Sequence, residues 1–297
     1  MTSTERSEEP QTLEGKDLSV TALYTAHTWA WAGFEGAELF ASDQTRAVFK
    51  VTNGALTLMR LFRWGLPRLP EGLAQRHLLI DQLTEEYKAD VILELAAGLS
   101  SRALRFSKPD SSSLRRYLEV DLPHVIEFKE SRYREQELNL PLLTLHPLDL
   151  QMLDIMTLRT WLESTSRPLI IAEGIIMYLS ASDAQRLLEQ IAEVLRPRGG
   201  RLIFDWVPTV EQPRPGFIGR CLAALMRLFT GGQDFQRDER TRQSMCDALE
   251  TLGAYTKVYD TRRVAAAREL PHAHLNTQQL IFCADWSMAS TDDERDE

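Results

Sequence analysis

Short apolar runs alternate with amphipathic helical stretches from residue 90 onward. Seven of these runs have the length and composition of strands: residues 91–95, 117–120, 142–145, 169–172, 202–204, 255–259 and 280–283. Strands that alternate with helices predict a mostly parallel sheet with helices on both faces. Only 20 residues with a weak helical pattern join the last two runs, which favours an antiparallel edge strand. The pattern therefore predicts an α/β fold with a seven-stranded sheet.

The most regular helical pattern lies between the fourth and fifth runs. Its apolar positions form one stripe: Leu187, Leu188, Ile191, Val194 and Leu195. Such a stripe is typical of a helix that covers a sheet. Ser182 or Asp183 can cap its first turn, and Gly199 and Gly200 can end it. Pro123 fits the first turn of the helix after the second run, where its missing N–H costs nothing.

The part of the chain before the sheet, residues 17–87, combines helical spacing with many aromatic residues and is a predicted helical extension. No repeat and no linker rich in Pro, Gly or Ser divides the chain after it, so we expect a single domain over residues 17–286. Residues 1–16 and 287–297 lack the apolar periodicity that could offset the entropy of ordering them, and we expect disordered tails. A helical stretch at residues 216–229 is either a lid or part of the core.

Composition and charge exclude several partners. The 297 residues carry a formal charge of −9, but residues 1–16 carry −2 and residues 290–297 carry −4, so the body carries only −3. A near-neutral body lacks the concentrated basic charge of nucleic-acid-binding proteins. Cys221, Cys246 and Cys283 fit neither a disulfide framework nor a zinc site. No apolar stretch approaches the roughly 18 residues of a membrane span. We therefore expect a cytoplasmic protein without nucleic-acid or membrane partners; its oligomeric state stays open.

A turn of small residues follows the first predicted strand. The segment VILELAAGLSSR, residues 91–102, ends its strand near Glu94 and continues with Ala96, Ala97 and Gly98. Small residues allow a ligand to approach the backbone closely. A dinucleotide site requires G-x-G-x-x-G so that its phosphates reach a helix N-terminus, and only Gly98 is present. The turn therefore favours a nucleoside ligand without phosphates over NAD.

Asp121 ends the second predicted strand, 23 residues after Gly98. A carboxylate at this position can accept hydrogen bonds from both hydroxyls of a ribose, in the crevice where open α/β sheets bind nucleotides. Glu119 lies two residues earlier, so its side chain is on the same face of the strand, and it could take that role. The alternative is that both acids only cap the next helix.

Polar residues also follow the third and fourth predicted strands. Asp149 could accept a hydrogen bond from an adenine amino group while Leu150 packs on the ring, although an Asp in such a loop is commonly a helix cap. Glu173 comes directly after the fourth strand, where the crevice opens, and Gly174 permits close approach.

Six segments follow one another along the chain: ELAAGLSSRALRF, YLEVDLPHVIEFK, LDL, IIAEGIIMYLS, RLIFDWV and NTQQLIFCA. Together they resemble the leucine carboxyl methyltransferase family over about residues 20–285, and in particular its bacterial branch of polyketide-associated O-methyltransferases. The resemblance implies a Rossmann-like, class I methyltransferase fold, with S-adenosyl-L-methionine as cofactor and a small molecule as methyl acceptor.

The resemblance also implies roles for individual residues. It assigns five of them to the cofactor by position: Gly98 in the turn, Asp121 at the ribose, Asp149 and Leu150 at the adenine, and Glu173 in the wall of the site. Arg76, in the segment QRHLLID, resembles the family arginine that pairs with the methionine carboxylate. The alternative for Arg76 is a solvated helix residue.

The turn after the first strand departs from the family pattern, which reads GAG followed by LDTR. Ala96 stands where glycine is usual, which we expect to be tolerated if its φ angle stays negative. Ser100 replaces an aspartate, so this loop offers no carboxylate to the methionine amine. Glu94 remains available for that contact.

Methyl transfer from a sulfonium is a one-step displacement, so the protein mainly aligns the reactants and excludes water. A carboxylate acceptor needs no general base, whereas a hydroxyl must lose its proton. Tyr24 and His27 are candidates to touch the acceptor; the alternative is that the aromatic extension only packs. No metal ligands are predicted. The sequence favours O-methylation of a hydroxyl or carboxyl group on a polyketide-like small molecule. The alternatives are a non-catalytic S-adenosylmethionine-binding or interaction module and an NAD-dependent oxidoreductase.

Overall fold

The structure is a computed structural model. It describes residues 18–61, 68–108, 113–211, 240–275 and 277–286. Both predicted tails and the helix predicted at residues 216–229 lie outside these residues. In the described ranges, no helix is both long and apolar enough to cross a bilayer.

All seven predicted strands are present and form one sheet. They are β1 (Val91–Leu95), β2 (Arg116–Asp121), β3 (Leu143–Pro147), β4 (Pro168–Ala172), β5 (Arg201–Asp205), β6 (Tyr255–Asp260) and β7 (Leu280–Asp285). Their order is β3-β2-β1-β4-β5-β7-β6. The first five are parallel, and β7 runs antiparallel to both of its neighbours, β5 and β6. The predicted antiparallel pair thus forms one edge of the sheet, with β6 outermost.

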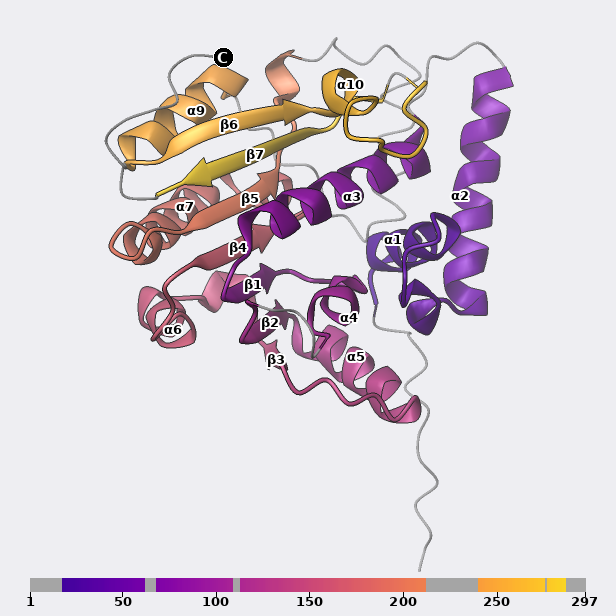
Figure 1. Ribbon diagram of the computed structural model, residues 1–297. Helices are drawn as coiled ribbons and strands as arrows, with labels where there is room; N and C mark the ends of the chain where they lie inside the picture. The colour runs from indigo at the N-terminus through magenta and orange to yellow at the C-terminus, as the bar shows by residue number, and fades with distance from the viewer. Residues whose placement is uncertain (1–17, 62–67, 109–112, 212–239, 276, 287–297) are drawn as a thin grey trace, which may run out of the picture.

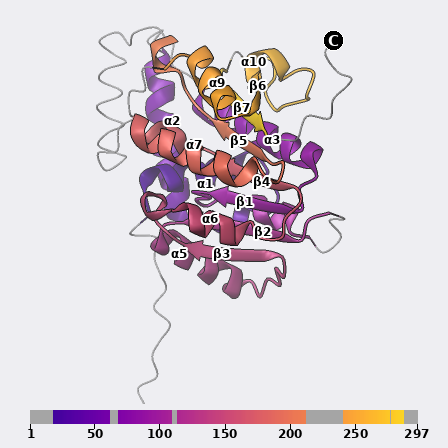
Figure 2. The same cartoon turned by 90° about the vertical axis from the view of Figure 1, so that its left-hand side faces the viewer.

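Helices cover both faces of the sheet. They are α3 (Leu69–Tyr87), α4 (Arg102–Phe106), α5 (Pro123–Glu135), α6 (Ile155–Trp161), α7 (Ala181–Leu195), α9 (Arg242–Thr251) and α10 (Thr261–Val264), with short 3-10 turns η2 (Leu150–Met152), η3 (Ile176–Tyr178) and η4 (Thr209–Glu211). One core cluster joins the sheet to α6, α7 and α9, and another joins it to α3 and α4. Figure 2 shows α3 and α7 on opposite sides of the strands. Every residue of β1 and β4 is buried, as expected for strands covered on both faces.

The predicted amphipathic helix is α7, and its cap differs from our expectation. Ser180, rather than Ser182 or Asp183, is the N-cap, and its hydroxyl oxygen accepts a hydrogen bond from the Asp183 amide at 3.1 Å. The helix therefore begins earlier than the apolar stripe indicates, because a cap lies before the first turn and not within it. Gly199, with φ +60°, lies in the turn that follows the helix.

The N-terminal extension stands at the carboxyl ends of the parallel strands (Figure 1). It consists of α1 (Val20–Trp31), the 3-10 turn η1 (Ala37–Phe40) and α2 (Asp43–Leu61). Phe40 packs in one cluster with Leu99 and Phe128, and Trp29 packs in another with Leu73. These contacts hold the extension against the edge of the sheet at which open α/β folds bind their ligands.

Candidate active site

The turn between β1 and α4 lies beside the end of β2. Asp121 accepts hydrogen bonds from two backbone amides: its Oδ2 from Gly98 at 2.6 Å and its Oδ1 from Leu122 at 2.7 Å. Burial raises the pKa of the Asp121 carboxyl, although both amides oppose that shift. The structure thus brings together Gly98 and Asp121, the two residues that the sequence placed at this point of the crevice. A Cβ added at Gly98 would meet nothing within 4 Å.

Ala96 does not have the negative φ that was our condition for alanine to be tolerated there. Its φ is +52°, and Gly98 has the same φ of +52°. The left-handed conformation crowds a Cβ against the following carbonyl oxygen, which is why glycine suits such positions. The chain reverses at the end of β1 while the Ala97 amide still bonds to the Val120 carbonyl of β2. Ala96 is therefore strained, and the departure from the family glycine has an energetic cost.

Arg76 in α3 points to the ends of β4 and β5. Its Nε donates to Glu173 Oε1 at 2.9 Å and its Nη1 to Asp205 Oδ2 at 2.8 Å, and its side chain is 9% exposed. Burial lowers the pKa of Arg76, but the two carboxylates outweigh that effect and raise it. Arg76 is thus not a solvated helix residue.

One nitrogen of Arg76 remains uncommitted. Its Nη2 has no hydrogen-bond partner among the described residues. Gly174, with φ +71°, borders this nitrogen, and a Cβ at position 174 would lie 3.4 Å from it. The Gly174 amide itself donates to Asp205 Oδ1 at 2.5 Å. Position 174 therefore carries no side chain next to a guanidinium N–H that two carboxylates hold in place.

Arg102 is the centre of a buried ionic network. It is fully buried and donates from Nε to Asp81 Oδ1 at 2.6 Å, from Nη2 to Glu173 Oε2 at 2.5 Å and from Nη1 to Glu94. The Tyr117 hydroxyl donates to the other oxygen of Glu94 at 2.5 Å. Glu94, which the sequence offered to the methionine amine, therefore already has a donor on each oxygen and is only 2% exposed. It serves Arg102.

His77 joins this network between two aromatic rings. Its Nδ1 lies 2.9 Å from Glu173 Oε2, and its Nε2 lies 2.8 Å from Arg105 Nη2. Nδ1 also lies 2.9 Å from Arg102 Nη2, so each ring nitrogen of His77 faces an arginine, which can only donate. Burial, and then the charge of Arg102, lower the pKa of His77. The Trp29 ring stacks on the imidazole at 4.3 Å.

The network contains more acids than bases. Its charged members are Arg76, Arg102 and Arg105 against Asp81, Glu94, Glu173 and Asp205. Counted formally and without His77, three positive and four negative groups leave one negative charge in excess, while burial raises the pKa of Asp205. Buried ions require partners, so this interior favours a ligand that brings a positive charge.

Asp149 is a helix cap, which was the alternative to its predicted contact with adenine. Its Oδ1 accepts from the Gln151 amide at 2.9 Å and caps η2. Asp149 is exposed, whereas Leu150 is half-buried and packs against the core cluster that contains β1, β2 and β4. Both follow β3 at the same edge of the sheet as Asp121.

Tyr24 and His27 face α2. The Tyr24 hydroxyl donates to Asn53 Oδ1 at 3.0 Å, and its ring stacks on Phe49 at 5.5 Å. The His27 ring lies 4.9 Å from Phe49. Its Nδ1 is buried and has no hydrogen-bond partner in the part of the chain that the structure describes. Burial, followed by the charges of Arg46 and Lys50, lowers the pKa of His27.

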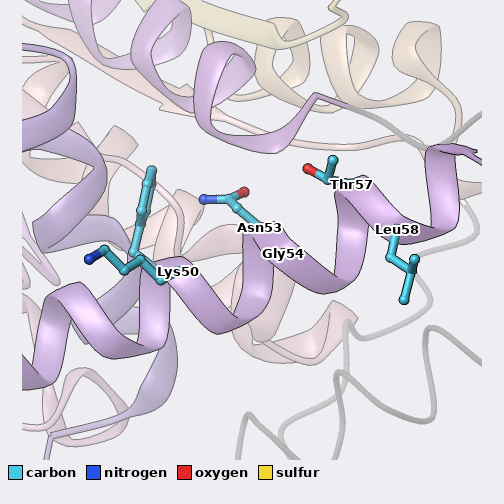
Figure 3. A pocket seen from close by; sticks show the side chains of 6 residues that line it. Lys50, Asn53, Gly54, Thr57 and Leu58 are labelled. Atoms are coloured by element: carbon cyan, nitrogen blue, oxygen red, sulfur yellow. The ribbon is translucent and has the colours of Figure 1, made fainter.

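A pocket runs along α2 next to these two side chains (Figure 3). Its lining residues all belong to that helix: Phe49, Lys50, Asn53, Gly54, Thr57 and Leu58. Phe49 and Asn53 are also the contacts of His27 and Tyr24. The two predicted acceptor-side residues thus contact two side chains that line this pocket, although they do not line it themselves.

Sequence reasoning gave no role to Arg102, Asp205 or Asp81. Asp205 directly follows the predicted strand of residues 202–204, as Asp121 directly follows that of residues 117–120, so the same signal was present. His77 and Asp81 are four residues apart and lie on one face of α3. A His and an Asp on such a face indicate a buried polar cluster.

Comparison with known proteins places this site in context. The family model for leucine carboxyl methyltransferases matches residues 34–192. A tetracenomycin polyketide synthesis O-methyltransferase from Streptomyces glaucescens is 31% identical over 39% of this chain and 39% of its own length. A putative S-adenosyl-L-methionine-dependent methyltransferase from Mycobacterium avium is 29% identical over 51% of this chain. The match spans 49% of that relative, so this chain aligns with half or less of each.

Among solved structures, an O-methyltransferase family protein from Burkholderia thailandensis has a TM-score of 0.49 and 12% identity. The match covers 92% of this chain and 73% of that protein.

Proposed function

The chain belongs to the leucine carboxyl methyltransferase family, and we propose that it transfers the methyl group of S-adenosyl-L-methionine to an oxygen atom of a small molecule. The proposal extends to a hydroxyl or carboxyl group on a polyketide-like acceptor. The named activity of the Streptomyces glaucescens relative supports oxygen as the acceptor atom and a polyketide as the acceptor class.

The observation that carries the proposal is the uncommitted Nη2 of Arg76 beside Gly174. A guanidinium with a free N–H in a partly dry site binds carboxylates through short, charge-assisted hydrogen bonds. The methionine carboxylate of the cofactor fits this position, and Glu173 and Asp205 hold the arginine ready for it. A side chain at position 174 would lie against that nitrogen, so glycine there agrees with the fit.

Asp121 fits the ribose. Each of its oxygens accepts one backbone amide. A carboxylate oxygen can accept more than one hydrogen bond, so each retains a position for one ribose hydroxyl. Next to it, Gly98 leaves open space along the turn. Asp149 retains an exposed carboxylate oxygen for the adenine amino group, with Leu150 as an apolar neighbour.

The charge of the site also fits. S-adenosylmethionine carries a sulfonium, an ammonium and a carboxylate, so its net charge is +1. The buried network has one negative charge in excess. We therefore assign the cofactor to the crevice between Arg76 and Asp121.

When bound, S-adenosylmethionine supplies an electrophilic methyl group on its sulfonium. The residues of this chain orient and shield the reactants. Arg76 and Asp121 fix the two ends of the crevice, and α1 with its buried Trp29 excludes water from its open side. His27 has an Nδ1 without a partner among the described residues and a lowered pKa, which are the properties of a base that is neutral near pH 7. It would take the proton from a hydroxyl acceptor, and a carboxylate acceptor would not need it.

Labelled S-adenosylmethionine tests this function. The protein is incubated with the methyl-labelled cofactor and a panel of phenols, hydroxylated polyketides and carboxylic acids, while calorimetry measures binding of the cofactor and of NADH. We expect cofactor binding and transfer of label to an oxygen acceptor. Binding without transfer to any acceptor would favour a non-catalytic module. Binding of NADH in place of S-adenosylmethionine would favour an oxidoreductase and refute the proposal.

A further inference from the structure

Lys129 is a buried lysine that the proposed mechanism does not use. It lies in α5, and its side chain is fully buried. Its Nζ donates to the Ser100 carbonyl oxygen at 3.0 Å and lies 2.7 Å from Glu119 Oε2. The Phe40 ring of η1 covers the ammonium, with its centroid 5.3 Å from Nζ.

The Ser100 carbonyl depends on this lysine. Ser100 precedes Ser101, the N-cap of α4, so its carbonyl lies before the helix. The Leu104 amide donates to the Ser101 carbonyl. Lys129 therefore supplies a donor that the helix does not. Ser100 itself ends the turn that contains Gly98, and its amide closes that turn by bonding to the Ala97 carbonyl at 3.1 Å.

Stability alone does not explain the pair. Removing a lysine and a glutamate from water costs several kcal/mol, and well-packed apolar residues of similar size are often as stable or more stable. Burial raises the pKa of Glu119 to about 7, and the charge of Lys129 opposes that shift. Glu119 and Asp121 lie two residues apart on β2, so the pair ties the cofactor turn to the strand that carries the ribose ligand.

We propose that Lys129 is a positioning residue for the cofactor, which fixes the turn of residues 96–101 through the Ser100 carbonyl and thereby holds the Gly98 amide against Asp121. Glu119 is its buried counter-ion and not a ribose ligand, since it is fully buried beneath the sheet edge. The inference rests on the proposed function for its ligand, but the position of the turn can be measured without any ligand.

The test replaces both members of the pair, so that no unpaired charge remains in the core. The double variant Glu119→Met with Lys129→Met is compared with the double variant Arg201→Met with Asp285→Leu. The latter removes a partly buried ion pair, with an Nε to Oδ1 distance of 2.7 Å, where β5 begins and β7 ends. It controls for the loss of any ion pair within the sheet.

Hydrogen exchange of the backbone amides, measured without cofactor, reports how firmly the turn is held. We expect faster exchange at Gly98 in the Lys129 double variant, unchanged exchange in the core strands β1 and β4, and no change at Gly98 in the control. Calorimetry with S-adenosylhomocysteine should show affinity weaker by about ten-fold or more, as for a lost charge-assisted hydrogen bond, with turnover at saturating cofactor nearly preserved.

The two proposals fail in different ways. Unchanged exchange at Gly98 in a folded Lys129 double variant would overturn the positioning role, whatever the cofactor affinity. Equal loosening in the control would also overturn it, because the effect would then be general. If the unmodified protein binds no S-adenosylhomocysteine while Gly98 exchange still depends on Lys129, the positioning of the turn stands and the proposed function fails.

Discussion

Replacing Ala96 by glycine is expected to stabilise the protein. Ala96 has φ +52°, and the left-handed conformation costs an L-residue about 1–2 kcal/mol. Glycine removes that strain, but its freedom in the unfolded chain returns about 0.4–1 kcal/mol. Ala96 is half-buried, so its methyl group contributes little packing. The net gain in the free energy of unfolding is about 0.5–1 kcal/mol.

Urea unfolding followed by circular dichroism measures this difference, with Ala97→Gly as the matched control. Ala97 lies in the same turn but has no positive φ, and it is buried at 6% exposure. Glycine at position 97 should therefore destabilise the protein by about 1 kcal/mol or more, through unfolded-state entropy and the loss of a buried methyl group. Equal losses in both variants would show that the left-handed strain at Ala96 is not significant, and the reasoning would be refuted.

Further predictions concern the buried ionic network, the cofactor-binding residues and the acceptor-side residues. Asp121→Ala should weaken S-adenosylmethionine binding by about 1.5–3 kcal/mol through lost charged hydrogen bonds; unchanged affinity in calorimetry would contradict the ribose assignment. Arg102→Met should cost about 3–5 kcal/mol in urea unfolding because it leaves buried carboxylates unpaired, whereas Arg159→Met, which breaks an exposed pair, should cost less than about 1 kcal/mol; similar losses would show that the buried network is not stabilising. His27→Ala and Tyr24→Phe should change turnover more than cofactor affinity, and equal effects on both would exclude the extension as the acceptor side. The pKa of His27 is lowered, and its neutral form is the proposed base. With a hydroxyl acceptor, the rate should therefore fall only when the pH drops below the usual histidine pKa of about 6.5. This loss of rate at low pH should be absent in His27→Ala.

The fold could be predicted because its signals are local. Each strand is an apolar run whose length and flanks appear in the sequence, and all seven were located to within one or two residues at each end. The chain direction of β7 followed from the short connection before it. The cap of α7 was displaced because several hydroxyl and carboxyl groups stand together at residues 180–183, and only the backbone shows which one precedes the first turn.

The site could be predicted only in part, for a physical reason. Gly98 and Asp121 end adjacent parallel strands, so the topology alone brings them together. The partners of Arg102 come from α3, β1 and the end of β4. Which of these acids a given arginine meets depends on how α3 crosses the sheet, and no local pattern encodes that crossing. The φ of Ala96 likewise depends on the path of the turn and not on the residue.

The acids at the strand ends bind arginine side chains, and their effect on a ligand is exerted through those arginines. Glu173 contacts both Arg76 and Arg102, and Asp205 holds the second side of Arg76. A guanidinium in such a dry place is stable only when carboxylates surround it, so these acids are the condition for having a preoriented arginine in the crevice. Four carboxylates serve three arginines here, and the excess of one negative charge is compensated when a ligand brings a cation. We therefore propose that the formal charge of −1 in this interior, and not the total of −9 that lies mostly at the two ends of the chain, favours a cationic ligand.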